Sequence, residues 1–280
     1  MRWILAFAAL AAIAPAPARA GEPDIVQPFV IESGGVKIAG EIHAQDAKRC
    51  TAVIVVGGSN VRTRGDTAVA IPFFLGPEMA VVVMDRRGNG KSTGQFEIPD
   101  TKNTAWQIPR FGHDVAAVAR HLKAQGFRRV VLVGTSMGGW INDSAAAAAP
   151  DAIDAVVSMT GGASTVGVSD EFDRLASSGL SIHEAAKQAS SYRGPQGYDP
   201  SSDLASVRQP ILWVFGAKDI SNPSELDLSN VKRFAEQGKQ FQWILLPNSD
   251  HEFVNATTHE FDSTWVEPVR TFLRGTTPCA

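Results

Sequence analysis

The sequence contains little cysteine and no excess of positive charge. Cys50 and Cys279 are the only cysteines among the 280 residues, which excludes a zinc site built from cysteine thiolates. The formal net charge of −3 leaves no basic field that would attract nucleic acid or an anionic membrane surface. No internal repeat, run of like charges or long low-complexity segment follows residue 20. Composition therefore indicates an ordinary soluble globular protein and no nucleic-acid partner.

The sequence also lacks an apolar run long enough to span a membrane. Arg2 precedes a mostly apolar stretch over residues 3–13, and the Ala-Arg-Ala of residues 18–20 fits the small-x-small pattern of a cleavage site. An apolar run of about eleven residues is too short to cross a bilayer as a helix. We therefore expect residues 1–20 to be a signal peptide. Residues 21–280 should then form one exported domain, periplasmic or secreted, with no integral membrane segment after cleavage.

One stretch of the chain combines the three elements of a nucleophile elbow. Residues 130–133 are apolar and mostly β-branched, which is typical of a strand buried on both faces. Residues 134–138 read Gly-Thr-Ser-Met-Gly, and the alanine-rich segment that follows, up to Pro150, predicts a helix. Small residues around Ser136 allow the strand and the helix to approach each other, so the serine hydroxyl stands exposed at the strand end. This context favours an elbow over a glycine-rich turn that contains a serine by coincidence.

Strands and helices alternate along the rest of the chain. Two strands around Gly34-Gly35, within residues 29–42, predict a β-hairpin. Buried strands are expected over residues 52–56, 80–84, 130–133, 153–159, 211–215 and 241–246, and helices over residues 68–75, 115–126 and 263–273. This order predicts an α/β fold, with a mostly parallel sheet and helices on both faces.

Residues 162–200 break this alternation. The segment is polar and carries only scattered apolar residues, such as Phe172, Leu175 and Tyr192. Because it follows a predicted strand, it should lie at the edge of the sheet where ligands enter. We expect a small, partly helical lid; the alternative is an ordinary long surface excursion.

The candidate catalytic residues lie at the ends of predicted strands. A serine hydroxyl becomes a good nucleophile only when a base accepts its proton and a third group orients that base. His251 follows the last strand and is the candidate base, whereas the other five histidines fit surface or packing positions better. Asp219 ends the preceding strand and is the candidate acid; Asp250 is its competitor, but it is adjacent to His251 and projects differently. The chain order serine, aspartate, histidine fits this kind of fold.

Two backbone N–H groups are candidates for an oxyanion hole. The first is that of Met137, directly after the nucleophile. The second should come from the loop after residues 52–56, where Gly58 allows close approach of the backbone; Ser59 is the first choice and Asn60 the second. No metal and no cofactor enter this scheme.

Taken together, these motifs resemble the α/β-hydrolase superfamily, in its serine-esterase branch with a minimal lid. The resemblance covers roughly residues 29–274 and is carried by Gly57-Gly58-Ser59, the D-x-R-G-x-G-x-S stretch of residues 85–92, the Ser136 elbow, Gly216-x-x-Asp219 and His251. The chain departs from the common pattern at Gly57, where a histidine usually stands. The resemblance places Asp85 and Arg87 in a structural turn. It implies hydrolysis of a small acyl substrate, with carboxylesterases and peptidase-like enzymes among the relatives.

Other readings remain open. Thioester or lactone hydrolysis would use the same residues, and a non-catalytic ligand-binding module can share the fold. Nucleotide binding is suggested by Gly-Lys-Ser at residues 90–92, but Asp85 stands where a phosphate loop needs glycine. Export permits a Cys50–Cys279 disulfide that would tie the C-terminal tail to the core. Two separate thiols are the alternative.

Overall fold

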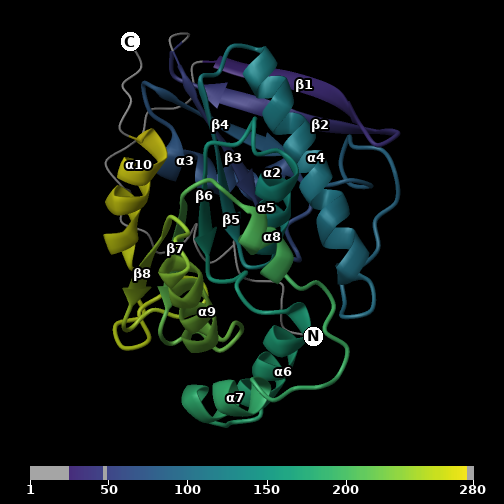
Figure 1. The fold of residues 1–280 in the computed structure, drawn as a ribbon. Coiled ribbons are helices and arrows are strands. Elements are labelled where there is room, and N and C mark those ends of the chain that lie inside the picture. Colours follow the sequence, from purple (N-terminus) through teal and green to yellow (C-terminus); the bar gives the residue numbers. More distant parts are fainter. Residues whose placement is uncertain (1–24, 47–48, 276–280) are drawn as a thin grey trace.

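The structure, a computed structural model, describes residues 25–46 and 49–275. Its centre is an eight-stranded sheet with the strand order β1-β2-β4-β3-β5-β6-β7-β8 (Figure 1). The strands are β1 (Ile25–Ser33), β2 (Val36–Ala44), β3 (Thr51–Val56), β4 (Met79–Met84), β5 (Arg129–Thr135), β6 (Ala155–Met159), β7 (Ile211–Gly216) and β8 (Phe241–Leu246). Strands β3 to β8 run parallel to one another, whereas β2 pairs antiparallel with both β1 and β4. The predicted α/β-hydrolase fold, with its mostly parallel sheet, is therefore confirmed.

The predicted hairpin is present at the edge of this sheet. Strands β1 and β2 pair from Ile25–Ala44 to Ser33–Val36. Gly34 and Gly35, which connect them, have φ angles of 53° and 78°. Two consecutive residues at positive φ form the tight turn whose twist matches a hairpin, and glycine adopts that conformation without steric cost.

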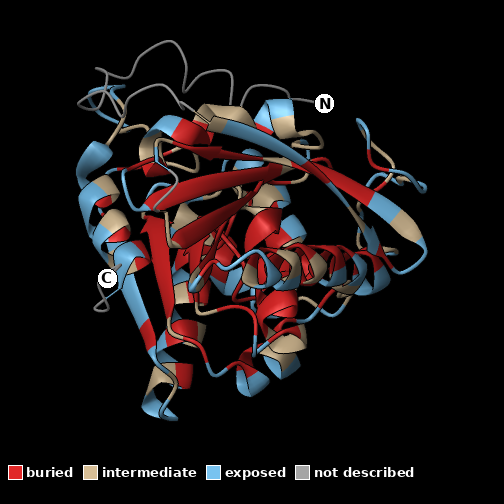
Figure 2. Ribbon diagram, turned by 90° about the horizontal axis from the view of Figure 1, so that it is seen from above, coloured by how far each residue is buried: buried red, intermediate tan, exposed pale blue. Residues whose placement is uncertain are grey.

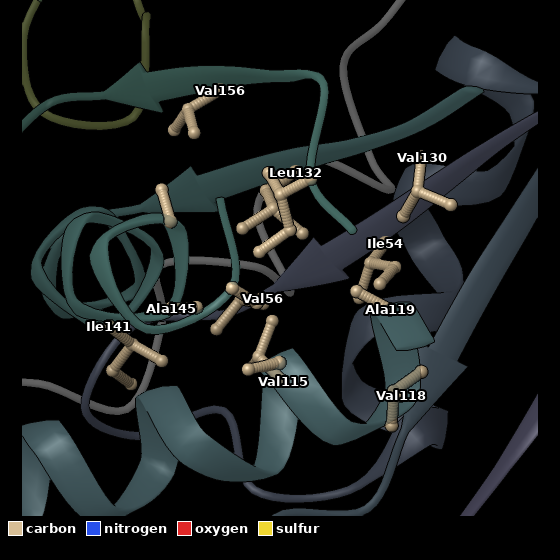
Figure 3. Packing of buried hydrophobic residues seen from close by; sticks show 14 of the residues in the cluster. Ile54, Val56, Val115, Val118, Ala119, Val130, Leu132, Ile141, Ala145 and Val156 are labelled. Carbon is tan, nitrogen blue, oxygen red and sulfur yellow. The ribbon is translucent and has the colours of Figure 1, made fainter. Parts of the chain in front are cut away.

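Helices cover both faces of the sheet. The helices and 3₁₀ turns outside residues 162–200 are α2 (Arg64–Thr67), η1 (Ala68–Ala70), α3 (Ile71–Phe74), α4 (Thr104–Ala124), α5 (Met137–Ala148), α8 (Ser201–Ser206), α9 (Ser224–Glu236), η2 (Ser263–Trp265) and α10 (Val266–Arg274). On one face, Val115 of α4 and Ile141 of α5 pack against Ile54, Leu132 and Val156 of the strands (Figure 3). On the other face, α3 and α10 cover a second apolar cluster. The central strands β3 to β7 are buried almost throughout, whereas β1 and β8 at the two edges are partly exposed (Figure 2).

The elements differ from the predicted ones at several points. Helix α4 begins at Thr104, eleven positions before the predicted start at Val115. Its first turns were missed because Thr104 and Gln107, which lie on the buried face, are polar. The helix expected over residues 68–75 is divided into a 3₁₀ turn and α3, and Pro72 lies in the first turn of α3. A proline is tolerated there because it lacks only an N–H that the helix does not use. Helices α8 and α9 were not predicted.

Residues 162–200, the predicted lid, contain the helices α6 (Val166–Ser177) and α7 (Ile182–Ala189). These helices extend away from the sheet at the bottom of Figure 1. They enclose a small apolar cluster of their own, made of Phe172, Leu175, Ala185, Ala186 and Ala189. The side chains of Thr165 and Ser181 accept hydrogen bonds from the first turns of α6 and α7, so both helices begin at a capping residue.

The chain termini lie outside the described residues, and with them the predicted signal peptide, residues 1–20. Within residues 25–46 and 49–275, no helix is both long enough and apolar enough to cross a membrane. Cys50 is disulfide-bonded. Its predicted partner Cys279, the only other cysteine in the sequence, lies outside the described residues.

Candidate active site

Ser136 lies at a sharp turn between β5 and α5. Its φ and ψ angles are 53° and −124°, a conformation that non-glycine residues rarely adopt and that is frequent at functional sites. Gly134 and Gly138 allow this turn to form. A Cβ atom at Gly138 would lie 2.2 Å from the carbonyl oxygen of Val56, and one at Gly134 would lie 2.3 Å from the carbonyl oxygen of Gly138. The Ser136 N–H donates to the carbonyl oxygen of Met159, 2.8 Å away, which fixes the turn to the neighbouring strand β6.

The structure brings Asp219 and His251 into direct contact. The Asp219 Oδ2 atom lies 2.8 Å from His251 Nδ1, and the two side chains are 0% and 9% exposed. The other oxygen, Asp219 Oδ1, accepts hydrogen bonds from the backbone N–H groups of Ser221 and Asn222 at 2.7 and 2.9 Å. Both carboxylate oxygens are therefore engaged, and the carboxylate holds the imidazole through Nδ1. This contact leaves His251 Nε2 as the nitrogen that remains for a substrate or a nucleophile.

Charges around His251 shift its pKa. Burial lowers the pKa, but the Asp219 carboxylate, its hydrogen bond, and the nearby carboxylates of Glu252 and Asp250 outweigh burial and raise it to about 9. The surrounding carboxylates thus stabilise the imidazolium that forms when His251 accepts a proton, whereas only the neutral ring can accept one.

Asp250, the competing acid, has a different role. Its Oδ1 atom accepts hydrogen bonds from the backbone N–H groups of Glu252 and Val254, at 3.0 and 2.8 Å. It shapes the loop that carries His251, while Asp219 contacts the ring. Asn222 was not singled out from the sequence. Its side chain donates to the carbonyl oxygen of Thr160, and its backbone N–H donates to Asp219, so it joins the loops that follow β6 and β7.

Arg86 holds the loop that carries the proposed oxyanion donor. Its guanidinium group donates to the carbonyl oxygens of Gly57 and Gly58 at 2.9 and 3.0 Å, and to that of Ser59 at 3.5 Å. Burial and the neighbouring Arg62 lower the pKa of Arg86 to about 10, which still leaves it charged at neutral pH. The loop passes close to the nucleophile, since a Cβ atom at Gly58 would lie 3.2 Å from Ser136 Cβ. Arg86 was missed because sequence spacing does not reveal which carbonyl groups a buried arginine reaches.

The flanking residues of Arg86 form the turn that the resemblance implied. Asp85 accepts hydrogen bonds from the backbone N–H groups of Arg64 and Lys91, both at 2.8 Å. Arg87 forms a buried bidentate ion pair with Asp114, at 2.9 and 2.6 Å. Both side chains are thus fully used in fixing the loops. The Gly-Lys-Ser of residues 90–92 lies in this turn and does not open a helix, unlike a phosphate loop.

A cavity of about 330 Å³ opens beside Ser136. Ser59, Asn60 and Met137, the residues of the predicted oxyanion hole, line it together with Ser136. The Met137 N–H belongs to the first turn of α5, where backbone N–H groups have no acceptor within the helix. The cavity also receives side chains from α6, among them Ser169, Asp170 and Asp173. Within the described part of the chain, no group of three or more histidine, cysteine or acidic side chains is arranged to hold a metal ion.

Comparison with known proteins gives one family match and many similar folds. The model of the prolyl oligopeptidase family (Peptidase_S9) matches residues 69–276. The fold is similar to the esterase Pf2001 of Pyrococcus furiosus (16% identity, TM-score 0.61, 89% of this chain and 92% of that one). It is also similar to ferulic-acid-bound Est1E of Butyrivibrio proteoclasticus (18% identity, TM-score 0.56, 88% of this chain and 97% of that one). A third similar structure is the Pyrococcus horikoshii acylaminoacyl peptidase (13% identity, TM-score 0.63, 90% of this chain and 42% of that one). No curated protein matches the chain.

Proposed function

The chain belongs to the prolyl oligopeptidase family, and from that premise we propose that it cleaves an acyl ester through an acyl-enzyme formed on Ser136. Membership makes it a serine hydrolase of the α/β-hydrolase superfamily. Two features carry the proposal: the strained turn at Ser136, and the buried contact between Asp219 and His251. A binding module would need neither feature, and both are costly to maintain.

In the proposed mechanism, His251 Nε2 accepts the Ser136 proton as the hydroxyl oxygen attacks the acyl carbonyl. Asp219 keeps the imidazole in the required tautomer and stabilises the imidazolium that forms. The protonated His251 then donates its proton to the leaving group, and the acyl-enzyme remains. Water, deprotonated by the same imidazole, releases the acid and regenerates Ser136.

The tetrahedral intermediate carries a negative charge on the former carbonyl oxygen. We assign its stabilisation to the backbone N–H groups of Met137 and Ser59, with Asn60 as the alternative to Ser59. The hydrogen bonds from Arg86 support this assignment, because they hold the carbonyl oxygens of the loop on the guanidinium side. Donors that are fixed before the reaction need no reorganisation when the charge develops.

Peptide or amide cleavage is the second candidate. It is favoured by the family match and by the similar fold of the acylaminoacyl peptidase, of which this chain covers 42%. The same three residues would perform either reaction. A substrate series of matched esters, thioesters, lactones and peptide amides, assayed with the wild type and Ser136→Ala, distinguishes the two. We expect hydrolysis of esters with an initial burst of about one alcohol per chain. Loss of the burst and of turnover in Ser136→Ala would support the mechanism, whereas retention of more than a few per cent of the activity would contradict it.

The proposal extends to export and to a lid formed by residues 162–200. The lid is supported by the contribution of α6 to the cavity wall beside Ser136. Export is supported by the sequence pattern of residues 1–20. N-terminal sequencing of the protein recovered from cell fractions tests the second point. A mature chain that begins at Gly21 and lies outside the cytoplasm is expected; an intact Met1 in the cytoplasm would contradict it.

A further inference from the structure

The wall that α6 contributes to the cavity is acidic. Asp170 and Asp173 lie three positions apart on this helix and both line the cavity, and Asp100 lines it from another loop. Arg62 is the one basic side chain among the described lining residues. Its guanidinium carbon lies 4.6 Å from the centre of the Phe96 ring, so this cation is already in contact with an aromatic face. The cavity therefore has an excess of negative charge next to the nucleophile.

The acidic residues on this wall are not held in ion pairs. No ion pair to Asp100, Asp170 or Asp173 occurs among the described residues, and Asp170 accepts no hydrogen bond there. Glu171, on the same helix, shows the contrast: it forms a bidentate contact with Arg174 at 2.7 and 2.8 Å. The basic side chain of α6, Arg174, thus pairs with Glu171, and neither of these residues lines the cavity.

A second observation points to a ligand at the same wall. Ser169 is 3% exposed and lines the cavity, yet its hydroxyl has no hydrogen-bond partner among the described residues. A buried hydroxyl without a partner costs free energy, unless a ligand or a water molecule satisfies it. The hydroxyl oxygen can accept a hydrogen bond, as can the carboxylate oxygens of Asp170 and Asp173.

This wall is also electrostatically linked to the reacting groups. Asp173 interacts with both His251 and Asp219, and its pKa is raised, chiefly by partial burial. Partial enclosure, together with repulsion from Asp173 and Asp100, raises the pKa of Asp170 to about 6. Carboxylates that repel one another in this way are stabilised by a cation placed between them.

We propose that the Ser169, Asp170 and Asp173 side chains bind a protonated amine of the substrate, so that the preferred substrates are esters or amides that carry an ammonium group. The inference rests on the proposed function, since it describes the substrate of the same site. The ammonium group donates its hydrogen bonds to the two carboxylates and to the Ser169 hydroxyl. The acyl carbonyl lies at Ser136. An anionic substrate is disfavoured by the same charges.

Matched substrates with and without the amine test this proposal. L-Alanine benzyl ester is compared with benzyl propanoate, and L-alanine 4-nitroanilide with the propanoyl anilide, by kcat/KM at pH 7. An ammonium group also activates the neighbouring carbonyl chemically, so the decisive quantity is the change of the amine-to-neutral ratio between variants. Asp170→Asn/Asp173→Asn should lower this ratio about tenfold. Asp170→Asn alone, at an exposed position where folding is not at risk, should lower it about threefold.

Glu171→Gln is the control, because it removes one negative charge from the same helix at a residue that does not line the cavity. In Glu171→Gln the amine-to-neutral ratio of kcat/KM should stay within about twofold of the wild-type ratio. Equal ratios in the wild type and the double variant would overturn the proposal.

Failure of the proposed function is recognised separately. A folded wild-type protein that hydrolyses none of the four substrates contradicts the hydrolase mechanism. Calorimetric titration of Ser136→Ala with L-alanine benzyl ester then still tests the amine site. Tighter binding than that of benzyl propanoate, lost in Asp170→Asn/Asp173→Asn, supports it, and equal binding of the two esters overturns it.

Discussion

The Ser136 turn and the α6–α7 segment meet at one cavity but are built in different ways. The turn continues β5, whose residues 130–134 are all buried, and it is bonded to β6 through the Ser136 N–H. The α6–α7 segment carries its own small apolar cluster, and Asp170, Arg174 and Lys187 of these helices are exposed. One region is a part of the main core; the other is an appendage attached to it.

This difference separates chemistry from selectivity. Groups that break bonds must be held within a fraction of an ångström, and a doubly covered sheet provides that rigidity. Groups that select a substrate can lie on a segment of lower local stability, which can change without loss of the fold. Substitutions in the first region should therefore affect turnover of every substrate. Those in the second should affect the choice among substrates.

The largest expected effect is that of Asp219→Asn. The imidazole loses the acceptor that fixes its tautomer, so kcat should fall by about 10³- to 10⁴-fold. Asp250→Asn is the matched control, because it changes the same group one residue from His251, where the carboxylate accepts loop hydrogen bonds and acts on the imidazole through its charge. We expect it to lower kcat by less than about tenfold. Steady-state kinetics on one neutral ester measures both, and the opposite ranking would move the acid to Asp250.

A smaller loss is expected for Arg86→Met, which keeps most of the side-chain volume and removes the donors to Gly57, Gly58 and Ser59. The oxyanion loop would then lose its fixed orientation, and kcat should fall about 10²-fold with little change in KM. Thermal unfolding serves as the control for the loss of a buried charge. A rise in KM at unchanged kcat would show that the loop binds the substrate and does not stabilise the intermediate.

The pH dependence should follow His251. Since the base accepts a proton only when neutral, activity is lost below its pKa, which Asp219 helps raise to about 9. The value of kcat/KM should therefore rise about tenfold per pH unit through neutral pH and level off near pH 9. In Asp219→Asn the main cause of the increase is gone while burial still lowers the pKa, so the inflection should move to lower pH. A wild-type inflection at or below pH 6.5 would contradict this assignment.

The smallest effect on chemistry is expected for Phe172→Ala, in the cluster between α6 and α7. Replacing a fully buried phenylalanine with alanine lowers the free energy of unfolding by about 3–5 kcal/mol, and we expect this loss to be confined to residues 162–200. Limited proteolysis should cleave residues 162–200 faster than in the wild type. Turnover of a small neutral ester should change by less than about tenfold. A parallel collapse of that turnover would show that the segment and the sheet fold as one unit.

The sequence predicted well what depends on local patterns. Buried strands are short apolar runs, and the motif around Ser136 requires its neighbours within a few positions, so both could be recognised. Asp219 and His251 could be proposed because parallel strands end at the same edge. Their contact is in the structure; their catalytic roles remain predictions.

Features that depend on distant partners could not be predicted. Arg86 reaches carbonyl groups 27–29 positions away, and Asn222 bonds to Thr160, 62 positions away. Contacts over such separations produce no recognisable motif in the sequence. Helix α9 has few buried apolar residues, among them Val231 and Phe234, so its periodic pattern is weak. The acidic wall of α6 was read as a polar segment because only the fold shows which side faces the cavity.

The central claim is that Ser136 is the activated nucleophile of this chain, and covalent labelling tests it most directly. A fluorophosphonate reacts with a serine that a neighbouring base activates, and hardly at all with an ordinary hydroxyl group. Mass spectrometry of the labelled protein should show one adduct per chain, on the peptide that contains Ser136, and no adduct in Ser136→Ala. An unlabelled wild-type protein, or an adduct on another serine, would contradict the account.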